Sequence, residues 1–355
     1  MAYTDIDDPT IYFNTKLYTG NGSTNAITGV GFQPDWVWIK DRDTQQHHRL
    51  ADSVRGVKKN LKSDQTDLEN TTDSNDGMAS FDSDGFTLTE DNDDHGYNAN
   101  SSSQVSWNWK AGTSFSNDAS ATSVGTIDSS GSTNQTAGFS IVSWTGTGSA
   151  GTIAHNLGSV PEWYLLKVRS GATNNWAVYH NKSNANPEQY ALYLDGNSAA
   201  TDDSGLANDT APTSTVFSVT SGNYANQNGY TYIGYFFSEI KGYSKFGSYT
   251  GNGNADGTFV YTGFKPAWLL AKKSSGTGDW FLIDNKRSTI NPTNHQIEAN
   301  SSAAEDASGR FDFLSNGFKC VSSSTGSNGS GTTYIYMAFA ESPFTNSNGV
   351  PTNAR

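Results

Sequence analysis

The sequence predicts an all-β fold made of three tandem β-sandwich modules, jelly-roll or lectin-like, each of about 100 residues. Two observations lead to this prediction. Aromatic residues make up 12% of the chain although hydrophobic residues make up only 34%, and Gly, Ser, Thr and Asn are abundant. Such a composition suits short strands joined by polar turns, because long amphipathic helices need Leu, Ala, Glu and Lys in quantity. The second observation is a motif that occurs three times.

The motif consists of Pro, one residue, Trp, three residues and Lys. It occurs in GFQPDWVWIK (31–40), GSVPEWYLLK (158–167) and GFKPAWLLAK (263–272). Each copy follows an aromatic residue and a glycine turn, namely LYTGNG, SWTGTG or SYTGNG. Each unit also ends on an alternating aromatic strand, namely VSWNWKAG, YTYIGYFFSE or TYIYMAFAE. So many matched features predict three copies of one module, and the long period argues against a solenoid repeat.

These matches set the expected boundaries of the modules. We call residues 13–112 repeat one, 137–242 repeat two and 243–345 repeat three. The remaining parts are a docking segment at 1–12, a linker at 113–136 and a tail at 346–355. The segment 113–136 is rich in Ser, Thr, Gly and Asn without apolar periodicity, which predicts a flexible linker. Repeats two and three are joined by little more than IKGYS, so we expect them to pack rigidly together.

Within each motif the proline begins a strand, where its missing N–H does least harm. Strand alternation then places Trp36, Trp38 and Lys40 on one face and the apolar Val37 and Ile39 on the other. A strand that is apolar on both faces is usually covered on both, either by a second layer or by a neighbouring subunit. Residues that recur at fixed positions are more economically structural than ligand-binding. The predicted core therefore includes Trp36, Trp163, Trp268, Phe86 and Phe318.

Charge and cysteine content exclude several classes of protein. The net charge is −13, which argues against a nucleic-acid partner and against anionic membrane surfaces. Cys320 is the only cysteine, so neither a disulfide within the chain nor a multi-cysteine zinc site is possible. The N-terminal sequence lacks the basic start and apolar core of a secretory signal, and no apolar stretch is long enough to span a membrane.

No group of residues predicts catalysis, a cofactor or a firm metal site. Asp82 and Asp84 fit a turn better than calcium, because repeat three keeps the turn without the carboxylate, although a weak site in the Asp-rich loops stays open. The pair His47-His48 predicts a solvated loop, and His155 is expected to serve a turn. Cys320 is read as a small apolar filler. The chain is therefore not expected to be an enzyme.

A binding surface is expected in loops that differ between the repeats. The best candidates are residues 89–103 and 220–229, which combine Asn, Asp, Gly and a tyrosine as adaptable recognition loops do. The predicted receptor-binding residues are Asp91, Asp93, Asp94, His95, Tyr97, Asn223, Tyr224 and Asn226.

Long stretches of the chain also resemble a known family. The opening MAYTDIDDPTIYFNTKLYTGNGSTNAITGVGFQPDWVWIKDRD, with DSVRG, SFDSDGFTL and WNWKAG, closely resembles the start of a family of tailed-bacteriophage structural proteins common in marine phages. GFSIVSWTGTGSAGTIAHNLGSVPEW, GYSKFGSYTGNGNADGTFVYTGFKPAWLLAKK and YIYMAFAESPF look like the later modules of that family. The resemblance spans nearly the whole chain.

This resemblance implies a virion protein, a tail fibre or tail-tip adhesin that binds a host surface glycan or protein. Its expected partners are other virion proteins and further copies of itself, with a trimer favoured, and no nucleic acid or membrane insertion. The expected location is the virion tail, after synthesis in the host cytoplasm without a signal peptide. Two alternatives stay open: a head fibre or capsid decoration protein, and a glycan depolymerase that uses an unrecognised carboxylate pair.

Overall fold

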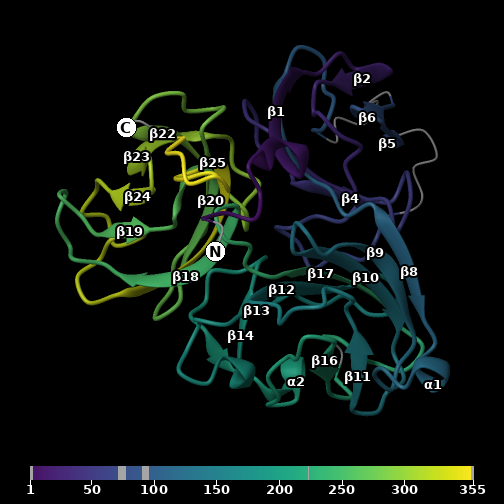
Figure 1. Cartoon of the computed structure of the whole chain (residues 1–355). Coiled ribbons are helices and arrows are strands. Elements are labelled where there is room, and N and C mark those ends of the chain that lie inside the picture. The colour runs from purple at the N-terminus through teal and green to yellow at the C-terminus, as the bar shows by residue number, and fades with distance from the viewer. Residues whose placement is uncertain (1–2, 71–76, 90–95, 223, 353–355) are drawn as a thin grey trace.

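A computed structural model describes residues 3–70, 77–89, 96–222 and 224–352 of the chain, which form three lobes around a common centre (Figure 1). Strands make up 44% of the chain and helices 4%, and the named strands pair antiparallel. The prediction of an all-β protein is therefore confirmed. The helical segments are single turns: η1 (Pro9–Ile11), α1 (Ala119–Thr122), η2 (Pro187–Gln189) and α2 (Ser204–Ala207). Among the described residues, no helix has the length and apolar character needed to cross a membrane.

Repeat one is built from two sheets. Its strands are β1 (Phe13–Thr19), β2 (Asn25–Thr28), β3 (Trp36–Asp41), β4 (Arg49–Asp52), β5 (Met78–Asp82), β6 (Gly85–Leu88) and β7 (Ser103–Trp109). The four-stranded sheet has the order β1-β7-β3-β4, and the three-stranded sheet has the order β2-β6-β5. The small sheet covers one face of β3, because Ile27 and Phe86 pack in one apolar cluster with Val37 and Ile39.

Repeat two has a wider main sheet. Its strands, with two from the segment before it, are β8 (Thr113–Asn117), β9 (Ser129–Asn134), β10 (Phe139–Thr145), β11 (Gly151–Ala154), β12 (Trp163–Val168), β13 (Ala177–His180), β14 (Tyr190–Tyr193), β15 (Thr201–Asp202), β16 (Val216–Val219) and β17 (Thr231–Phe237). The main sheet has the order β15-β14-β13-β12-β17-β10-β9-β8, and β11 pairs with β16 as the second layer.

Repeat three forms one continuous sheet. Its strands are β18 (Ser244–Thr250), β19 (Phe259–Tyr261), β20 (Phe264–Lys273), β21 (Trp280–Asp284), β22 (Thr293–Glu298), β23 (Asp306–Leu314), β24 (Gly317–Cys320) and β25 (Thr333–Pro343). Their order is β18-β25-β20-β21-β22-β23-β24-β19. The sheet turns back on itself, so that Phe311 and Phe318 pack against Leu269 of β20.

The three motif strands occupy equivalent places. Trp36 pairs with Trp109, Trp163 pairs with Phe237, and Trp268 pairs with Phe339. The five residues expected in the core, Trp36, Trp163, Trp268, Phe86 and Phe318, are all buried.

The second apolar face of each motif strand lies in a core that all three repeats share. Trp36, Trp163 and Trp268 belong to one cluster of buried side chains. Trp36 stacks on Tyr235 of repeat two at 4.5 Å between ring centroids, and Trp268 contacts Trp109 of repeat one at 5.6 Å. A second layer and the sister repeats of the same chain therefore cover the two faces. The expectation of a trimer no longer has support from these faces and rests on the family resemblance alone.

The lysine that ends each motif is buried in this arrangement. Lys167 donates from Nζ to the carbonyl of Thr66 in repeat one (2.8 Å), and Lys272 donates to the carbonyl of Ser198 in repeat two (2.9 Å). Lys40 donates to the carbonyl of Asp41 (2.7 Å). Burial lowers the pKa of each of these lysines to about 8.

A hydrogen bond at one repeated position links each repeat to the next. Trp176 donates from Nε1 to the carbonyl of Lys62 in repeat one (2.7 Å), and Trp280 makes the equivalent bond to repeat two (2.9 Å). In repeat one this position belongs to His48, which donates from Nε2 to the carbonyl of Glu298 in repeat three (3.0 Å). The three repeats therefore close a ring, and we call each contact between two repeats a seam.

The seam between repeats one and two carries a buried charge network. Glu69 accepts hydrogen bonds from Arg55 of its own repeat (3.2 Å) and from Arg169 of repeat two (3.0 Å). Arg55 is also paired with Asp52, and neither side chain of that pair is exposed. Tyr235 of repeat two donates to Asp52 as well (2.6 Å).

The seam between repeats three and one carries the same network at equivalent positions. Glu305 accepts from Arg287 of its own repeat (3.0 Å) and from Arg42 of repeat one (2.8 Å). Arg287 pairs with Asp284 (2.6 Å), which also accepts from the indole of Trp107 (3.0 Å). Burial acts to raise the pKa of Glu305, but the two guanidinium groups outweigh it and hold that pKa below its usual value.

The seam between repeats two and three has neutral residues at all four equivalent positions. Ser183 replaces the first arginine, Ala200 replaces the glutamate, Ser274 replaces the second arginine and His180 replaces the aspartate. The backbone bond of the seam persists, since Ala200 N donates to Ser274 O at 2.9 Å, as Glu305 N does to Arg42 O.

The two segments expected at the chain ends contact the body of the protein. Thr4 is buried and donates to the carbonyl of Lys241 (3.0 Å), and Ile6 joins the shared core. Asp7 accepts hydrogen bonds from Ser347 of the C-terminal segment. The described part of 1–12 therefore packs on the protein itself, and a docking role for this segment stays a prediction.

Candidate functional site

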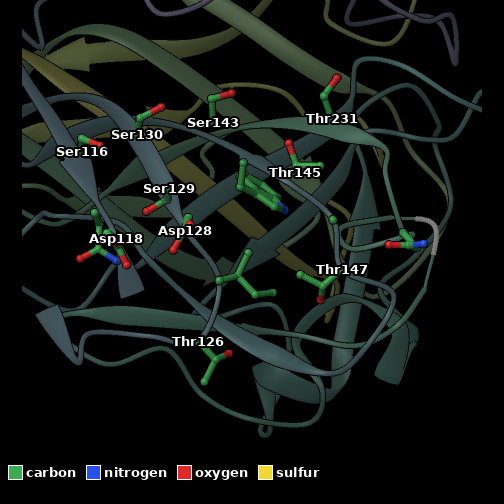
Figure 2. A pocket seen from close by; sticks show the side chains of 15 residues that line it. Ser116, Asp118, Thr126, Asp128, Ser129, Ser130, Ser143, Thr145, Thr147 and Thr231 are labelled. Carbon is green, nitrogen blue, oxygen red and sulfur yellow. The ribbon is translucent and has the colours of Figure 1, made fainter. Parts of the chain in front are cut away.

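A polar groove of about 710 Å³ lies at the edge of the main sheet of repeat two (Figure 2). We call it the hydroxyl groove. One side is formed by residues 116–118 and 126–130, and the other by residues 143–147 with Asn228 and Thr231. The first side comes entirely from the segment 113–136.

That segment was predicted to be a flexible linker, and this prediction is wrong. Its strands β8 and β9 pair with each other, and β9 pairs with β10 of repeat two. Gly131 allows the close approach of β10, because a side-chain carbon there would lie 1.9 Å from the carbonyl oxygen of Ile141. Asp118 caps α1 by accepting hydrogen bonds from the amides of Ser120 and Ala121. Small polar residues can form such edge strands without the apolar alternation that makes a strand visible in sequence.

A row of hydroxyl groups crosses the groove. Ser116 pairs with Ser130, and Ser130 pairs with Ser143, so the three side chains share one face of neighbouring strands about 4.8 Å apart. Figure 2 shows them in line. Ser116 and Ser130 are exposed, and among the described residues their hydroxyls have no hydrogen-bond partner. Ser143 is engaged, since it accepts from Arg169 (3.3 Å).

Two carboxylates lie beside the Ser116 and Ser130 part of the row (Figure 2). Hydrogen bonds from the hydroxyl of Ser120 and the amide of Ala121 lower the pKa of Asp118. Asp128 accepts from the amide of Ala119 (2.9 Å). An ionised Asp118 can accept hydrogen bonds from a ligand, whereas a general acid must hold a proton. The groove therefore offers hydrogen bonding to hydroxyl or amine groups.

Trp144 is one of the lining residues of the groove but does not present a free ring face. It is 3% exposed, stacks on Tyr232 at 5.4 Å and donates from its indole to the carbonyl of Ala225 (2.7 Å). Its role is packing, so ligand contacts in this groove fall to the polar side chains.

The predicted receptor-binding residues do not form a site in the described part of the chain. Asp91, Asp93, Asp94, His95 and Asn223 lie outside the described residues.

The other three predicted residues belong to the protein interior or its edge. Tyr97 is 2% exposed and packs in the apolar cluster of repeat one. Tyr224 is half-buried against Tyr193, with 5.7 Å between ring centroids. Asn226 is fully buried, and its amide donates to the carbonyl of Thr220 (2.9 Å) while its oxygen accepts from the amide of Thr147 (2.8 Å). The prediction that Tyr97 and Asn226 face a receptor is wrong.

Asn226 belongs to a repeated set that the sequence comparison missed. Asn98, Asn226 and Asn328 are each fully buried. Each donates from its amide to two backbone carbonyls and accepts a backbone amide at the glycine turn of its repeat. A buried amide must have its hydrogen bonds satisfied, and these asparagines are satisfied by the turn they hold. The sequence could have revealed this repeated set, because each asparagine lies shortly before the last strand of its repeat.

The histidine pair is part of the structure and does not form the solvated loop that we predicted. His48 is buried and accepts from the indole of Trp38 at Nδ1 (2.8 Å), and burial lowers its pKa to about 3. His47 pairs with Asp64 (2.6 Å). His155 serves a turn, since it accepts from the amide of Leu157 (3.2 Å), and burial lowers its pKa to about 4.

The remaining candidates for chemistry are also engaged in packing or turns. Asp84 accepts from the amides of Gly29 and Gly31, and these bonds lower its pKa. Cys320 is buried, and burial raises the pKa of its thiol to about 12. Within the described ranges, no three His, Cys, Asp or Glu side chains gather as metal ligands.

Residues 8–343 match a protein family described as a domain of unknown function (DUF7483). The chain belongs to this family. The match covers all three repeats as one unit, in agreement with the core that they share. The comparisons found no similar curated protein and no similar solved structure.

Proposed function

We propose that this protein is a virion structural protein of a tail fibre or tail tip, and that its hydroxyl groove binds a host surface glycan. In this proposal the three repeats are tandem β-sandwich modules of jelly-roll or lectin-like type, and they act as a rigid carrier. Other virion proteins hold it in place.

One observation carries the binding part of the proposal. One side of the hydroxyl groove is formed by the segment 113–136, which has no counterpart in repeats one and three, and the other side belongs to repeat two itself. Positions that recur three times have structural roles: Trp36 and its equivalents form the shared core, and Asn98 and its equivalents hold a turn within each repeat. A segment that is added to one repeat only, and that leaves polar groups unpaired, is better explained by a ligand.

The chemistry of the groove favours a neutral or amino sugar. Ser116 and Ser130 offer free hydroxyls, and Asn228 and Thr231 add polar groups at the other end. Asp118 and Asp128 would repel an acidic sugar. They would accept hydrogen bonds from the hydroxyl or amine groups of a neutral or amino sugar. The groove volume also falls within the range of about 300–1,000 Å³ that is usual for ligand sites.

A glycan array with the purified protein tests the binding role. We expect a neutral or amino glycan to bind, and the double variant Ser116→Ala with Ser130→Ala to bind it about tenfold more weakly, because each neutral hydrogen bond contributes about 0.5–1.5 kcal/mol. Ser114→Ala is the matched control, since Ser114 is exposed on the same strand outside the groove. Equal loss in the control, or no glycan bound at all, would contradict this role.

The location and the lack of catalysis are tested separately. Antibody-labelled virions viewed in negative stain should carry the label on the tail, and label on the head would favour a head fibre or decoration protein.

Incubation with host polysaccharide should release no reducing ends, and their release would favour a depolymerase.

A further inference from the structure

The seam between repeats two and three contains a groove of about 390 Å³. We call it the seam groove. Ser183, Ala200 and Ser274 line it. These residues stand where the other two seams carry the arginine, glutamate and arginine of the charge network. The seam groove therefore occupies the position that the network fills elsewhere in the ring.

One residue that lines the groove carries a buried polar group that no described residue satisfies. Ser183 is 8% exposed, and its hydroxyl has no hydrogen-bond partner among the described residues. A buried hydroxyl without a partner costs about 1–3 kcal/mol, so it is normally paired with protein or with a bound molecule. Beside it, Ser275 and Thr333 add hydroxyl groups to the wall, and Ala200 adds a methyl group. Mixed hydroxyl and methyl surfaces fit the mixed polar and apolar faces of a sugar ring.

The charge of this groove is opposite to that of the hydroxyl groove. No carboxylate lines it, and its one charged residue is Lys182, which makes no ion pair within the described residues. His180, whose carbonyl accepts a hydrogen bond from the amide of Ser183, donates to the carbonyl of Tyr336 (3.0 Å), and burial lowers its pKa to about 4, so it is neutral. A cavity whose only charged lining residue is a cation favours an anionic group over a basic one.

We propose that the seam groove is a second saccharide site, which takes an acidic sugar unit with its carboxylate toward Lys182 and its hydroxyls toward Ser183, Ser275 and Thr333. The proposal does not depend on the hydroxyl groove, because the two sites share no lining residue. The two grooves would let one chain bind two kinds of sugar within a host glycan.

Titration calorimetry with glucuronic acid, glucose and inorganic phosphate tests this proposal. We expect the wild-type protein to bind glucuronic acid about tenfold more tightly than glucose, because a charge-assisted hydrogen bond is about twice as strong as a neutral one. Phosphate should bind more weakly than glucuronic acid, because it uses the cation but not the hydroxyl wall. Equal binding of phosphate would identify a simple anion site and overturn the saccharide assignment.

Two variants locate the binding. The triple variant S183R/A200E/S274R rebuilds the charge network of the other seams and should remove glucuronic acid binding while leaving the hydroxyl groove intact. The variant K182Q should remove the preference for glucuronic acid over glucose, and because Lys182 is exposed this variant keeps the test available if the triple variant does not fold. The matched control S130A, in the other groove, should bind glucuronic acid as the wild type does. Binding that persists in the folded triple variant, or a preference that survives K182Q, would overturn the proposal.

Discussion

Two seams of the ring are joined by a buried arginine–glutamate–arginine network, whereas the third is joined by serine and alanine. The backbone hydrogen bond is the same in all three, at about 3 Å between N and O. The ring therefore closes without the network, and the network adds charge pairing where it occurs. Buried ion pairs are costly to desolvate, so losing a whole set at once, as in the seam between repeats two and three, can be tolerated better than losing one member. The seam groove occupies the space where that set is missing.

The largest expected effect comes from a residue of the shared core. Trp36→Ala should lower the free energy of unfolding by about 3–5 kcal/mol, because it leaves a large cavity between repeats one and two. The measurement is urea unfolding followed by circular dichroism. The exposed Tyr261→Ala is a control expected to change stability by less than about 0.5 kcal/mol. A Trp36 variant as stable as this control would show that the shared core does not hold the ring.

A smaller effect is expected from breaking one charged seam. Glu69→Gln keeps the size of the side chain but removes the charged partner of Arg169 and leaves Arg55 paired with Asp52 alone. We expect a loss of about 2–3 kcal/mol in urea unfolding. The control is Glu341→Gln, which breaks the half-exposed pair with Lys265 and should cost less than about 1 kcal/mol. Equal losses would mean that burial at the seam does not strengthen the network.

The next effect is the dependence of stability on pH, which tests His48, the residue of repeat one at the position of Trp176 and Trp280. Burial lowers the pKa values of His48, His155 and His180 to about 3, 4 and 4. These three histidines therefore stay unprotonated in the folded chain at pH values near 6.5 and somewhat below, where the same histidines of the unfolded chain take up protons. The free energy of unfolding should therefore fall as the pH drops from 6.5 toward 4, by about 1.4 kcal/mol per pH unit for each histidine.

His48→Trp places the residue of Trp176 and Trp280 at the equivalent position of repeat one. We expect it to remove one histidine from this pH dependence, which amounts to about 2 kcal/mol between pH 6.5 and pH 5. Urea midpoints at the two pH values give the result. An unchanged pH dependence would show that His48 is not held neutral in the folded protein.

The smallest expected effect is in the hydroxyl groove. Ser116→Ala and Ser130→Ala should each change stability by less than about 0.5 kcal/mol, because both hydroxyls are exposed and unpaired within the described residues. Thermal unfolding measures this change. A loss above about 1 kcal/mol would mean that the row supports the sheet and is not free for a ligand.

The sequence predicted the parts of the fold that use the same residue types in every repeat. The Pro-x-Trp strands could be found because their tryptophans recur, and their burial follows from two apolar faces. The equivalence of His48 with Trp176 and Trp280 could not be found in the sequence. The three residues occupy the same position in their repeats, but a histidine and a tryptophan are different residue types. The cover for the second apolar face could not be predicted either, since strand periodicity cannot distinguish a sister repeat from another subunit.

The candidate site was harder to predict than the fold. Asn226 and Tyr97 have the composition of recognition loops, but composition does not show whether an amide is satisfied by a turn or free in solvent. The segment 113–136 has the composition of a linker, and its strands depend on pairing with β10, which is a long-range contact. The hydroxyl row exists only once that pairing sets the register of Ser116, Ser130 and Ser143.

The central claim is that the three repeats form one cooperative unit through their shared core. Native-state hydrogen exchange at increasing urea tests it most directly, with amides in β3, β12 and β20 as reporters for repeats one, two and three. We predict that all three strands reach the same free energy of opening, and that Trp36→Ala lowers all three by the same amount. Three different opening free energies, with the Trp36 effect confined to β3 and its neighbours, would contradict the claim and show three independent modules.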